Sequence, residues 1–202
     1  MSRLFYRIMY SVGFKPWEQD TDEVMPQLRQ LLEREAQGDQ SLGRALDLGC
    51  GTGRWSLELA RRGWEVTGID VIAKAITGAR DRARAGGVEN VRFVEGDVTA
   101  LSDADLGRDY RFFLDVECFN HLSDEQRRAV ADGVNAVATS DATMLLLVWR
   151  RARRGPFPPG ATREDIEEAF AGWRVTNEDA YAGKLPAPLR RIDPRWYRLT
   201  RS

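Results

Sequence analysis

Short runs of hydrophobic residues alternate along this chain with longer stretches in which hydrophobic positions recur at helical spacing. The short runs predict five β-strands, at residues 45–48, 65–69, 91–94, 110–115 and 143–149. The stretches between them predict three helices, at residues 55–62, 72–85 and 124–138. This alternation is typical of a parallel sheet that is covered by helices on both faces. The central part of the chain is therefore predicted to be an α/β structure.

Further elements are predicted on either side of this central part. Ahead of it, helices at residues 4–10 and 23–35 form an N-terminal extension. After it, a helix at 162–171 precedes two closing strands at 173–179 and 195–200. Two of the predicted helices begin with the spacing of a capping box, in which a Ser or Thr is followed three residues later by a side chain that reaches back to it. The pairs are Ser123 with Gln126 and Thr162 with Asp165.

The clearest chemical signal lies between the first of these strands and the helix that follows it, where residues 47–53 read Asp-Leu-Gly-Cys-Gly-Thr-Gly. Three glycines at alternate positions let the backbone pass close to a ligand. The helix that follows directs its free N–H groups toward the same ligand. Asp70 ends the next strand, where an acid accepts hydrogen bonds from both hydroxyls of a ribose. Together these features predict a pocket for an adenosine-type ligand.

The acid that precedes the glycines separates two classes of cofactor. The dinucleotide pattern G-x-G-x-x-G fits imperfectly, because Ser56 stands at the last glycine position when counting begins at Gly51. Asp47 would repel a pyrophosphate, whereas it suits a ligand that carries an ammonium group. An acid followed by G-x-G-x-G is similar to the first motif of the class I S-adenosylmethionine-dependent methyltransferases.

The resemblance continues in the later strands. Residues 95–98, Glu-Gly-Asp-Val, are similar to the family segment in which an acid, here Asp97, faces the adenine amino group. Residues 110–122 resemble the fourth motif of the family and place Asp115 at the end of the fourth strand. With Asp47 and Asp70, these acids end four successive predicted strands.

This resemblance implies a complete fold. We expect a Rossmann-like three-layer α/β/α sandwich, whose seven-stranded sheet is mostly parallel and has an antiparallel last strand inserted near one edge. A single domain is expected over residues 1–202, with 1–40 as a helical lid or extension and 44–202 as the catalytic core.

The resemblance also implies S-adenosylmethionine as the cofactor and S-adenosylhomocysteine as its product. Asp47 would act on the amino group of the cofactor, directly or through water, and the Gly49 backbone would approach the methionine moiety. Asp70 would bind the ribose and Asp97 the adenine. The full set of cofactor-binding residues implied in this way is Trp17, Asp47, Gly49, Cys50, Gly51, Gly53, Asp70, Val71, Asp97, Val98 and Asp115.

Two residues after the fourth strand are candidates for acid–base catalysis, if the acceptor arrives protonated. His121 is the only histidine of the chain and titrates near neutrality; its alternative role is packing at the entry of the next helix. Glu117 can accept a proton from the acceptor or bind a cationic group; its alternative role is that of an exposed loop acid.

The N-terminal extension and the arginine-rich stretch at 150–154 are candidates for acceptor binding. Residues 16–18, Pro-Trp-Glu, are similar to the P-W-D element of thiopurine and related small-molecule methyltransferases, where this segment closes over cofactor and acceptor. The predicted acceptor residues are Tyr10, Phe14, Glu117 and Arg151. A solvated charge cluster is the alternative interpretation of the arginines. We expect a small, aromatic or apolar acceptor.

Composition limits the choice of partners and compartment. The 30 basic and 31 acidic side chains leave a net charge of −1, so no strong field favours nucleic acid or an anionic membrane. No apolar run approaches the ~20 residues that span a bilayer, and residues 1–10 lack a signal-peptide core. We therefore expect a cytoplasmic protein, a monomer or homodimer. Its two cysteines, Cys50 and Cys118, are expected to be neighbours and reduced, and no metal site is expected.

Two other functions fit part of the sequence. A nicotinamide-dependent oxidoreductase shares the glycine loop and Asp70, but it leaves Asp47 and Asp97 without a role. A module that binds S-adenosylmethionine without catalysis and regulates a partner fits the first motif equally well. The atom that is methylated, whether O, N, S or C, stays open at this point.

Overall fold

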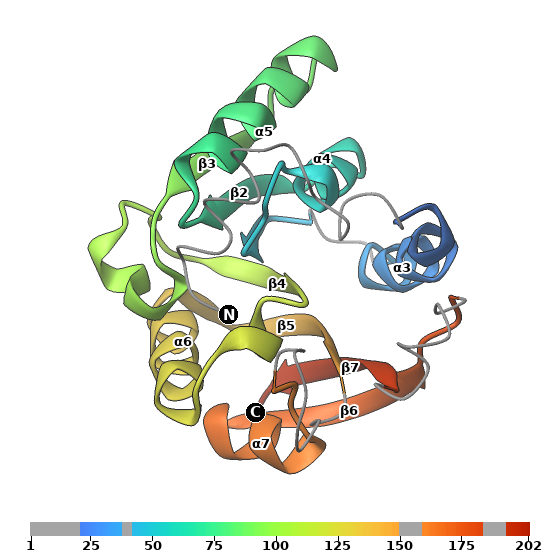
Figure 1. The fold of residues 1–202 in the computed structure, drawn as a ribbon, viewed down its shortest axis with the longest axis vertical. Coiled ribbons are helices and arrows are strands. Elements are labelled where there is room, and N and C mark those ends of the chain that lie inside the picture. The colour runs from blue at the N-terminus through green and yellow to red at the C-terminus, as the bar shows by residue number, and fades with distance from the viewer. Residues whose placement is uncertain (1–20, 38–41, 150–158, 184–192) are drawn as a thin grey trace.

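A seven-stranded sheet forms the centre of the protein, with the strand order β3-β2-β1-β4-β5-β7-β6 (Figure 1). The computed structural model describes residues 21–37, 42–149, 159–183 and 193–202. The strands are β1 (Arg44–Leu48), β2 (Glu65–Asp70), β3 (Val91–Glu95), β4 (Tyr110–Val116), β5 (Ala138–Trp149), β6 (Trp173–Ala180) and β7 (Pro194–Arg201).

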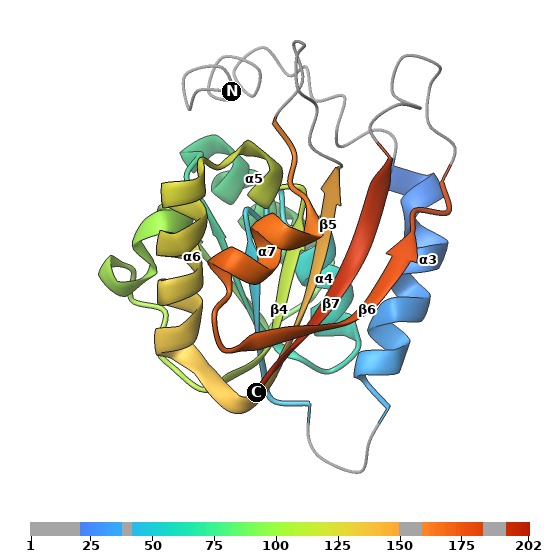
Figure 2. The same ribbon diagram turned by 90° about the horizontal axis from the view of Figure 1, so that it is seen from below.

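The direction of the strands agrees with the predicted fold. All pairs from β3 through β5 are parallel, and β7 runs antiparallel between β5 and β6. In Figure 2 the arrows of β5 and β6 accordingly point to the same end of the sheet. The prediction of a mostly parallel sheet with an antiparallel last strand near its edge is confirmed.

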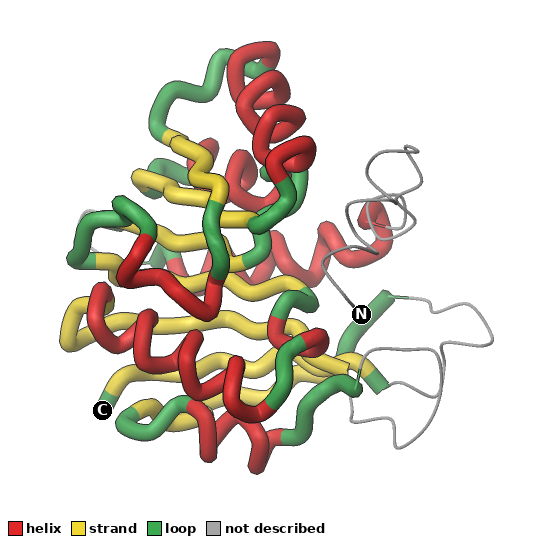
Figure 3. The backbone as a smooth tube through the Cα atoms, turned by 60° about the vertical axis from the view of Figure 1, so that its left-hand side comes forward, coloured by secondary structure: helices red, strands yellow, loops and turns green. Residues whose placement is uncertain are grey.

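Helices lie on both faces of the sheet (Figure 3). They are α3 (Thr21–Glu35), α4 (Arg54–Arg61), α5 (Ala73–Ala85), α6 (Asp124–Val137) and α7 (Arg163–Ala169), with short 3-10 helices η1 (Val98–Asp103) and η2 (Phe119–His121). One hydrophobic cluster joins α3 and α4 to the sheet and contains Leu32 and Trp196. A second cluster joins α6 and α7 to the sheet and contains Phe113, Val134 and Phe170. Both faces are thus buried, as parallel strands require.

Most predicted elements are present within a few residues of their expected bounds, and both predicted capping boxes are formed. The largest difference is the start of β5. It begins at Ala138, five residues before the predicted start, and its first residues are polar. Pairing of Ala138 with Tyr110 of β4, followed by a register shift, extends the strand without a hydrophobic pattern. The helix predicted at residues 4–10 lies outside the described residues.

Polar contacts of two α3 side chains, Gln27 and Glu35, fix this helix to the C-terminal half of the sheet. The Gln27 side chain donates to the Ala180 carbonyl at 2.7 Å and accepts from the Ala182 N–H at 2.8 Å. Glu35 accepts from Thr143 Oγ1 at 3.0 Å and forms an ion pair with Arg198. In the described part of the chain, no helix combines the length and the hydrophobicity that a membrane span needs.

Candidate active site

The turn between β1 and α4 is built from glycines in a conformation that other residues rarely adopt. Gly49, Gly51 and Gly53 have φ angles of 71°, 53° and 76°. A Cβ added at Gly49 would lie 2.7 Å from Cys118 Cβ, so this position also has no room for a side chain. The backbone N–H groups of Gly49 and Cys50 both donate to the carbonyl of Ile69 at the end of β2, at 2.9 and 3.0 Å. The turn is therefore fixed to the carboxyl end of strand β2.

Asp70 shapes the same turn. One of its carboxylate oxygens accepts the Gly51 N–H at 2.9 Å and the other accepts the Ile72 N–H at 2.8 Å. These two bonds fix the orientation of the Asp70 carboxylate beside the turn. The next residue, Val71, is half-buried and packs against Ile72 and Ala75.

Asp47 lies beneath the turn and is only 1% exposed. It accepts a hydrogen bond from Ser56 Oγ on α4 at 2.5 Å. Burial raises the pKa of the Asp47 carboxyl to about 7, against the lowering effect of the Ser56 bond, and the charge of Asp70 adds to the rise. Ser56 was noted in the sequence as a departure from the dinucleotide pattern; in the structure it is the partner of the acid.

Asp115, near the carboxyl end of β4, is a second buried acid and is also 1% exposed. Both of its oxygens accept the Phe119 N–H at 3.1 Å, and burial raises its pKa to about 7, with a further contribution from the charge of Asp47. Cys50 and Cys118 are free thiols here, and burial raises the pKa of each well above its ordinary value. Each thiol is also affected by the charge of Asp47.

Asp97 follows β3 and caps η1, where its side chain accepts the Thr99 N–H at 3.0 Å. Val98, the next residue, is buried in the hydrophobic cluster under α6. Asp97 thus has a structural role besides the adenine contact that the family motif implies. The two roles are compatible, because a carboxylate can accept several hydrogen bonds.

Glu117 and His121 lie beyond the end of β4. Glu117 is half-buried rather than exposed, with a φ angle of 73°, and its N–H donates to the Leu147 carbonyl at 3.2 Å. Burial raises the pKa of Glu117 to about 7, and a hydrogen bond from the Trp149 side chain opposes this rise. His121 is half-buried, and burial lowers its pKa to about 4, so its imidazole is neutral at pH 7.

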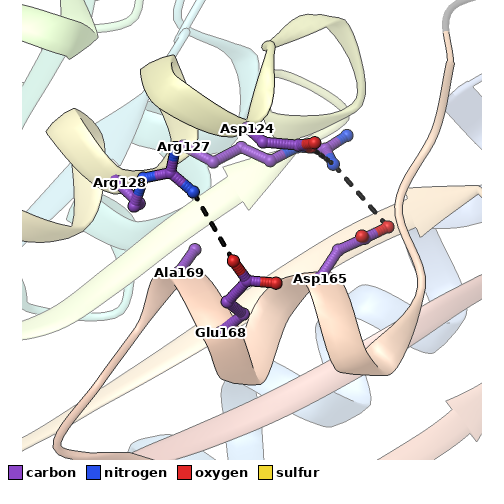
Figure 4. Close-up of a pocket in the computed structure, with 6 residues that line it drawn as sticks. All are labelled: Asp124, Arg127, Arg128, Asp165, Glu168 and Ala169. Atoms are coloured by element: carbon purple, nitrogen blue, oxygen red, sulfur yellow. Dashed lines mark hydrogen bonds and ion pairs between the residues drawn. The ribbon is translucent and has the colours of Figure 1, made fainter.

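A small cleft between α6 and α7 contains none of the predicted site residues (Figure 4). Ion pairs of Arg127 with Asp165 at 3.7 Å and of Arg128 with Glu168 at 3.5 Å join the two helices there. Arg127 is buried, lies 4.9 Å from the ring centroid of Phe119 and donates to the carbonyl of residue 160. Arg127 therefore joins α6 to η2, the short helix that carries His121.

Comparison with known proteins identifies the chemistry that such an arrangement serves. Residues 45–141 match the family described as a methyltransferase domain. This span contains the glycine turn and all four strand-end acids. The matched span thus belongs to the methyltransferase domain family.

Relatives of this methyltransferase domain differ in substrate. A 2-heptyl-1-hydroxyquinolin-4(1H)-one methyltransferase of Mycobacteroides abscessus is 30% identical over 147 residues, which are 71% of this chain and 59% of that protein. A 23S rRNA uracil-C5 methyltransferase of a Shewanella strain is 44% identical over 57 residues, 28% of this chain and 13% of that protein. The chain thus spans less than two thirds of the length of these curated relatives.

The fold is also that of a solved methyltransferase. The 1,6-didemethyltoxoflavin-N1-methyltransferase of Burkholderia thailandensis, crystallised with 1,6-didemethyltoxoflavin and S-adenosylhomocysteine, has a TM-score of 0.75 and 18% identity. The similarity covers 99% of this chain and 87% of that one.

The structure describes most of the predicted cofactor-binding residues but few of the predicted acceptor-binding residues. The acids and glycines of the predicted cofactor end are brought together at one edge of the sheet. Tyr10, Phe14, Trp17 and Arg151 lie outside the described residues, so their assignments stay predictions. Trp149, whose ring contacts the His121 ring, was not predicted, and its position at a strand end was the one signal that the sequence held.

Proposed function

We propose that this protein transfers the methyl group of S-adenosylmethionine to a small, aromatic or apolar acceptor. The observation that carries the proposal is Asp47, a buried acid beneath a glycine turn whose other side is formed by Asp70. A buried carboxylate at this place favours a ligand with an ammonium group and disfavours a pyrophosphate.

The charges of the described residues fit this cofactor. Among the described residues, no Lys or Arg forms an ion pair with Asp47 or Asp115. Buried carboxyls without a cation partner are stabilised either by a proton or by a cationic ligand.

The cofactor, when bound, supplies an electrophilic methyl group on a positively charged sulfur. The residues of this chain would hold the two reactants in line and exclude water, which is the main contribution a protein makes to such a displacement. Glu117 would accept the proton that the acceptor loses. A carboxyl with a pKa of about 7 suits this role, since a general base is most effective when its pKa lies near the working pH.

Two observations support a small aromatic acceptor. The rings of Trp149, which ends β5, and of His121, which follows β4, lie together, with centroids 6.4 Å apart. The relative that aligns over 147 residues is a hydroxyquinolone methyltransferase, and the solved neighbour holds a heteroaromatic ligand. The rRNA methyltransferase aligns over only 57 residues, and a net charge of −1 disfavours RNA. Two unpaired thiols beside the site favour a reducing compartment such as the cytoplasm.

Calorimetry tests the cofactor assignment. S-adenosylmethionine and S-adenosylhomocysteine are expected to bind and NAD is not; preferential binding of NAD would overturn the proposal. Asp70→Ala should weaken binding of S-adenosylhomocysteine by about 1–3 kcal/mol. Asp81→Ala, which changes an exposed acid of α5, is the matched control.

Turnover distinguishes an enzyme from a binding module without catalysis. Methyl transfer from labelled S-adenosylmethionine would be measured against a panel of hydroxylated heteroaromatic compounds. Glu117→Gln is expected to lower the transfer rate by roughly 10²–10⁴-fold while leaving S-adenosylhomocysteine affinity unchanged. Binding of the cofactor without transfer to any member of the panel would favour the regulatory alternative.

A further inference from the structure

A cavity of about 450 Å³ lies between the end of α3 and the sheet. Its wall is formed by the last turn of α3 and by residues of β4, β5 and β7, among them Arg34, Arg111, Thr143 and Arg198. Pockets of roughly 300–1,000 Å³ commonly hold small-molecule ligands. None of the predicted site residues that the structure describes lines this cavity. Its size is therefore sufficient for a small molecule that the methyltransferase site does not account for.

The cavity is at the amino end of the parallel strands, whereas the glycine turn is at their carboxyl end. Trp64, which lines the cavity, immediately precedes β2, and Asp70, which orients the glycine turn, ends the same strand. A strand rises about 3.3 Å per residue, so β2 separates these two residues by roughly 20 Å. The cavity is thus distinct from the pocket predicted for the cofactor.

Three arginines and two acids determine the charge of the cavity wall. Arg111 forms an ion pair with Asp141 at 3.1 Å, and Arg198 donates to both carboxylate oxygens of Glu35. The Arg34 side chain has no ion-pair partner among the described residues. Because arginine is always charged, three guanidinium groups against two carboxylates leave the described wall with one excess positive charge.

Both acids of the wall are already engaged by neighbouring donors. The Glu35 side chain is only 6% exposed and also accepts from Thr143 Oγ1 at 3.0 Å. Asp141 accepts from Thr139 Oγ1 at 2.7 Å in addition to its ion pair. A carboxylate that is neutralised by a nearby cation repels an anion less than an unpaired one does. The unpaired charge of Arg34 therefore favours an anionic ligand.

The same wall also has an apolar part, which is made by Ala36, Leu42 and Trp64. Trp64 is 4% exposed, and its ring centroid lies 5.2 Å from that of Phe112 in the core. Core packing thus fixes the position of the indole. A ligand that fits this wall combines a charged group with an apolar or aromatic body.

We propose that this cavity is a second ligand site, which binds a small organic anion. The carboxylate or phosphate group of the ligand meets Arg34, and its apolar body lies against Trp64. A guanidinium group can bind either kind of anion through two parallel N–H bonds. The bound molecule bridges α3 and the sheet, and it stabilises the protein because it binds the folded state.

Two-dimensional ¹H–¹⁵N NMR of the tryptophan indole groups tests this site, with benzoate and phenyl phosphate as probes. The chain has six tryptophans, and the signal lost in Trp64→Phe identifies Trp64. The Trp64 indole N–H is buried and has no hydrogen-bond partner, so its signal reports changes beside the cavity. A saturable shift of this signal is expected with at least one probe, and the stronger response distinguishes carboxylate from phosphate. The signal of Trp173, whose N–H donates to Asn135 of α6 at 2.7 Å, should stay in place.

Two comparisons test the role of charge. Arg34→Gln should weaken binding of the active probe roughly tenfold, the effect of one hydrogen bond to a charged group. Arg84→Gln, which changes an exposed arginine of α5 outside the cavity, is the matched control and should leave the affinity unchanged. Benzyl alcohol, a neutral probe with the same ring, should not shift the Trp64 signal.

Three results would each overturn the proposal. They are a Trp64 signal that neither anion shifts, an equal response to benzyl alcohol, and an Arg34→Gln variant that binds the probe as tightly as the wild type. Thermal unfolding checks that each variant is folded. The titrations contain no cofactor, so their outcome is independent of the proposed function.

Discussion

Replacement of Asp47 by Asn is expected to change how the stability of the ligand-free protein depends on pH. Asn preserves the size of the side chain and an oxygen that accepts the Ser56 hydroxyl bond. It removes a carboxyl that is 1% exposed and whose pKa burial raises from 3.8 to about 7. The variant thus isolates the cost of keeping an ionisable group beneath the glycine turn.

The sign follows from where the proton is held. Below pH 3.8 both the folded and the unfolded wild type are protonated at Asp47, and the group has no effect on the pH dependence. Between pH 3.8 and about 7 the folded state keeps the proton while the unfolded state loses it, so the free energy of unfolding falls as pH rises. The slope is about 1.4 kcal/mol per pH unit, and the total is roughly 4 kcal/mol.

Urea unfolding followed by tryptophan fluorescence at pH 4, 5, 6, 7 and 8 measures this difference. The Asp47→Asn variant should be more stable than the wild type at pH 8 by roughly 4 kcal/mol relative to their difference at pH 4. Asp81→Asn, on an exposed side chain, should leave the pH dependence unchanged. Parallel curves for Asp47→Asn and the wild type would refute the reasoning, because they would mean that the folded state does not retain the proton.

Two further predictions concern the surroundings of the site. Gly49→Ala should lower the free energy of unfolding by about 2–5 kcal/mol, because it combines a positive φ with a Cβ placed 2.7 Å from Cys118 Cβ. Gly172→Ala has a similar φ and no atom within 4 Å, and should cost only about 1–2 kcal/mol; equal losses in urea unfolding would exclude the steric argument. Arg127→Met should cost about 2–4 kcal/mol in the same assay, since it leaves the carbonyl of residue 160 and Asp165 without their buried partner. Arg128→Met, on an exposed pair with Glu168, should change stability by less than about 0.5 kcal/mol, and a comparable loss for both would contradict the role given to burial.

The elements that the sequence predicted well are those whose pattern is local. Hydrophobic runs mark β1 to β4 because the strands are buried on both faces. The glycine turn can be recognised because its glycines are residues that tolerate a positive φ angle. The short helix η1 was not predicted. It depends on the Asp97 cap and on packing against α6, neither of which is visible in a hydrophobic pattern.

The site was predicted in part for the same reason. Acids at strand ends can be recognised in the sequence, whereas the residues that form hydrogen bonds with them depend on the three-dimensional fold. Ser56 and Asp47 are nine residues apart, and Trp149 and Asn120 are 29 apart. Such pairs depend on the register between strands and on helix placement, which single-sequence patterns do not specify.

The polar contacts of Gln27 and Glu35 on α3 have a consequence for the synthesis of the chain. Gln27 reaches a carbonyl 153 residues later, and Glu35 reaches Arg198, 163 residues later. On the ribosome, α3 is synthesised long before β7, which completes the surface that receives it. The hydrophobic side of α3, with Leu28 and Leu32, therefore lacks part of its packing surface until β7 has been synthesised. The native contacts of α3 depend on β7, so loss of that strand would release α3 as well.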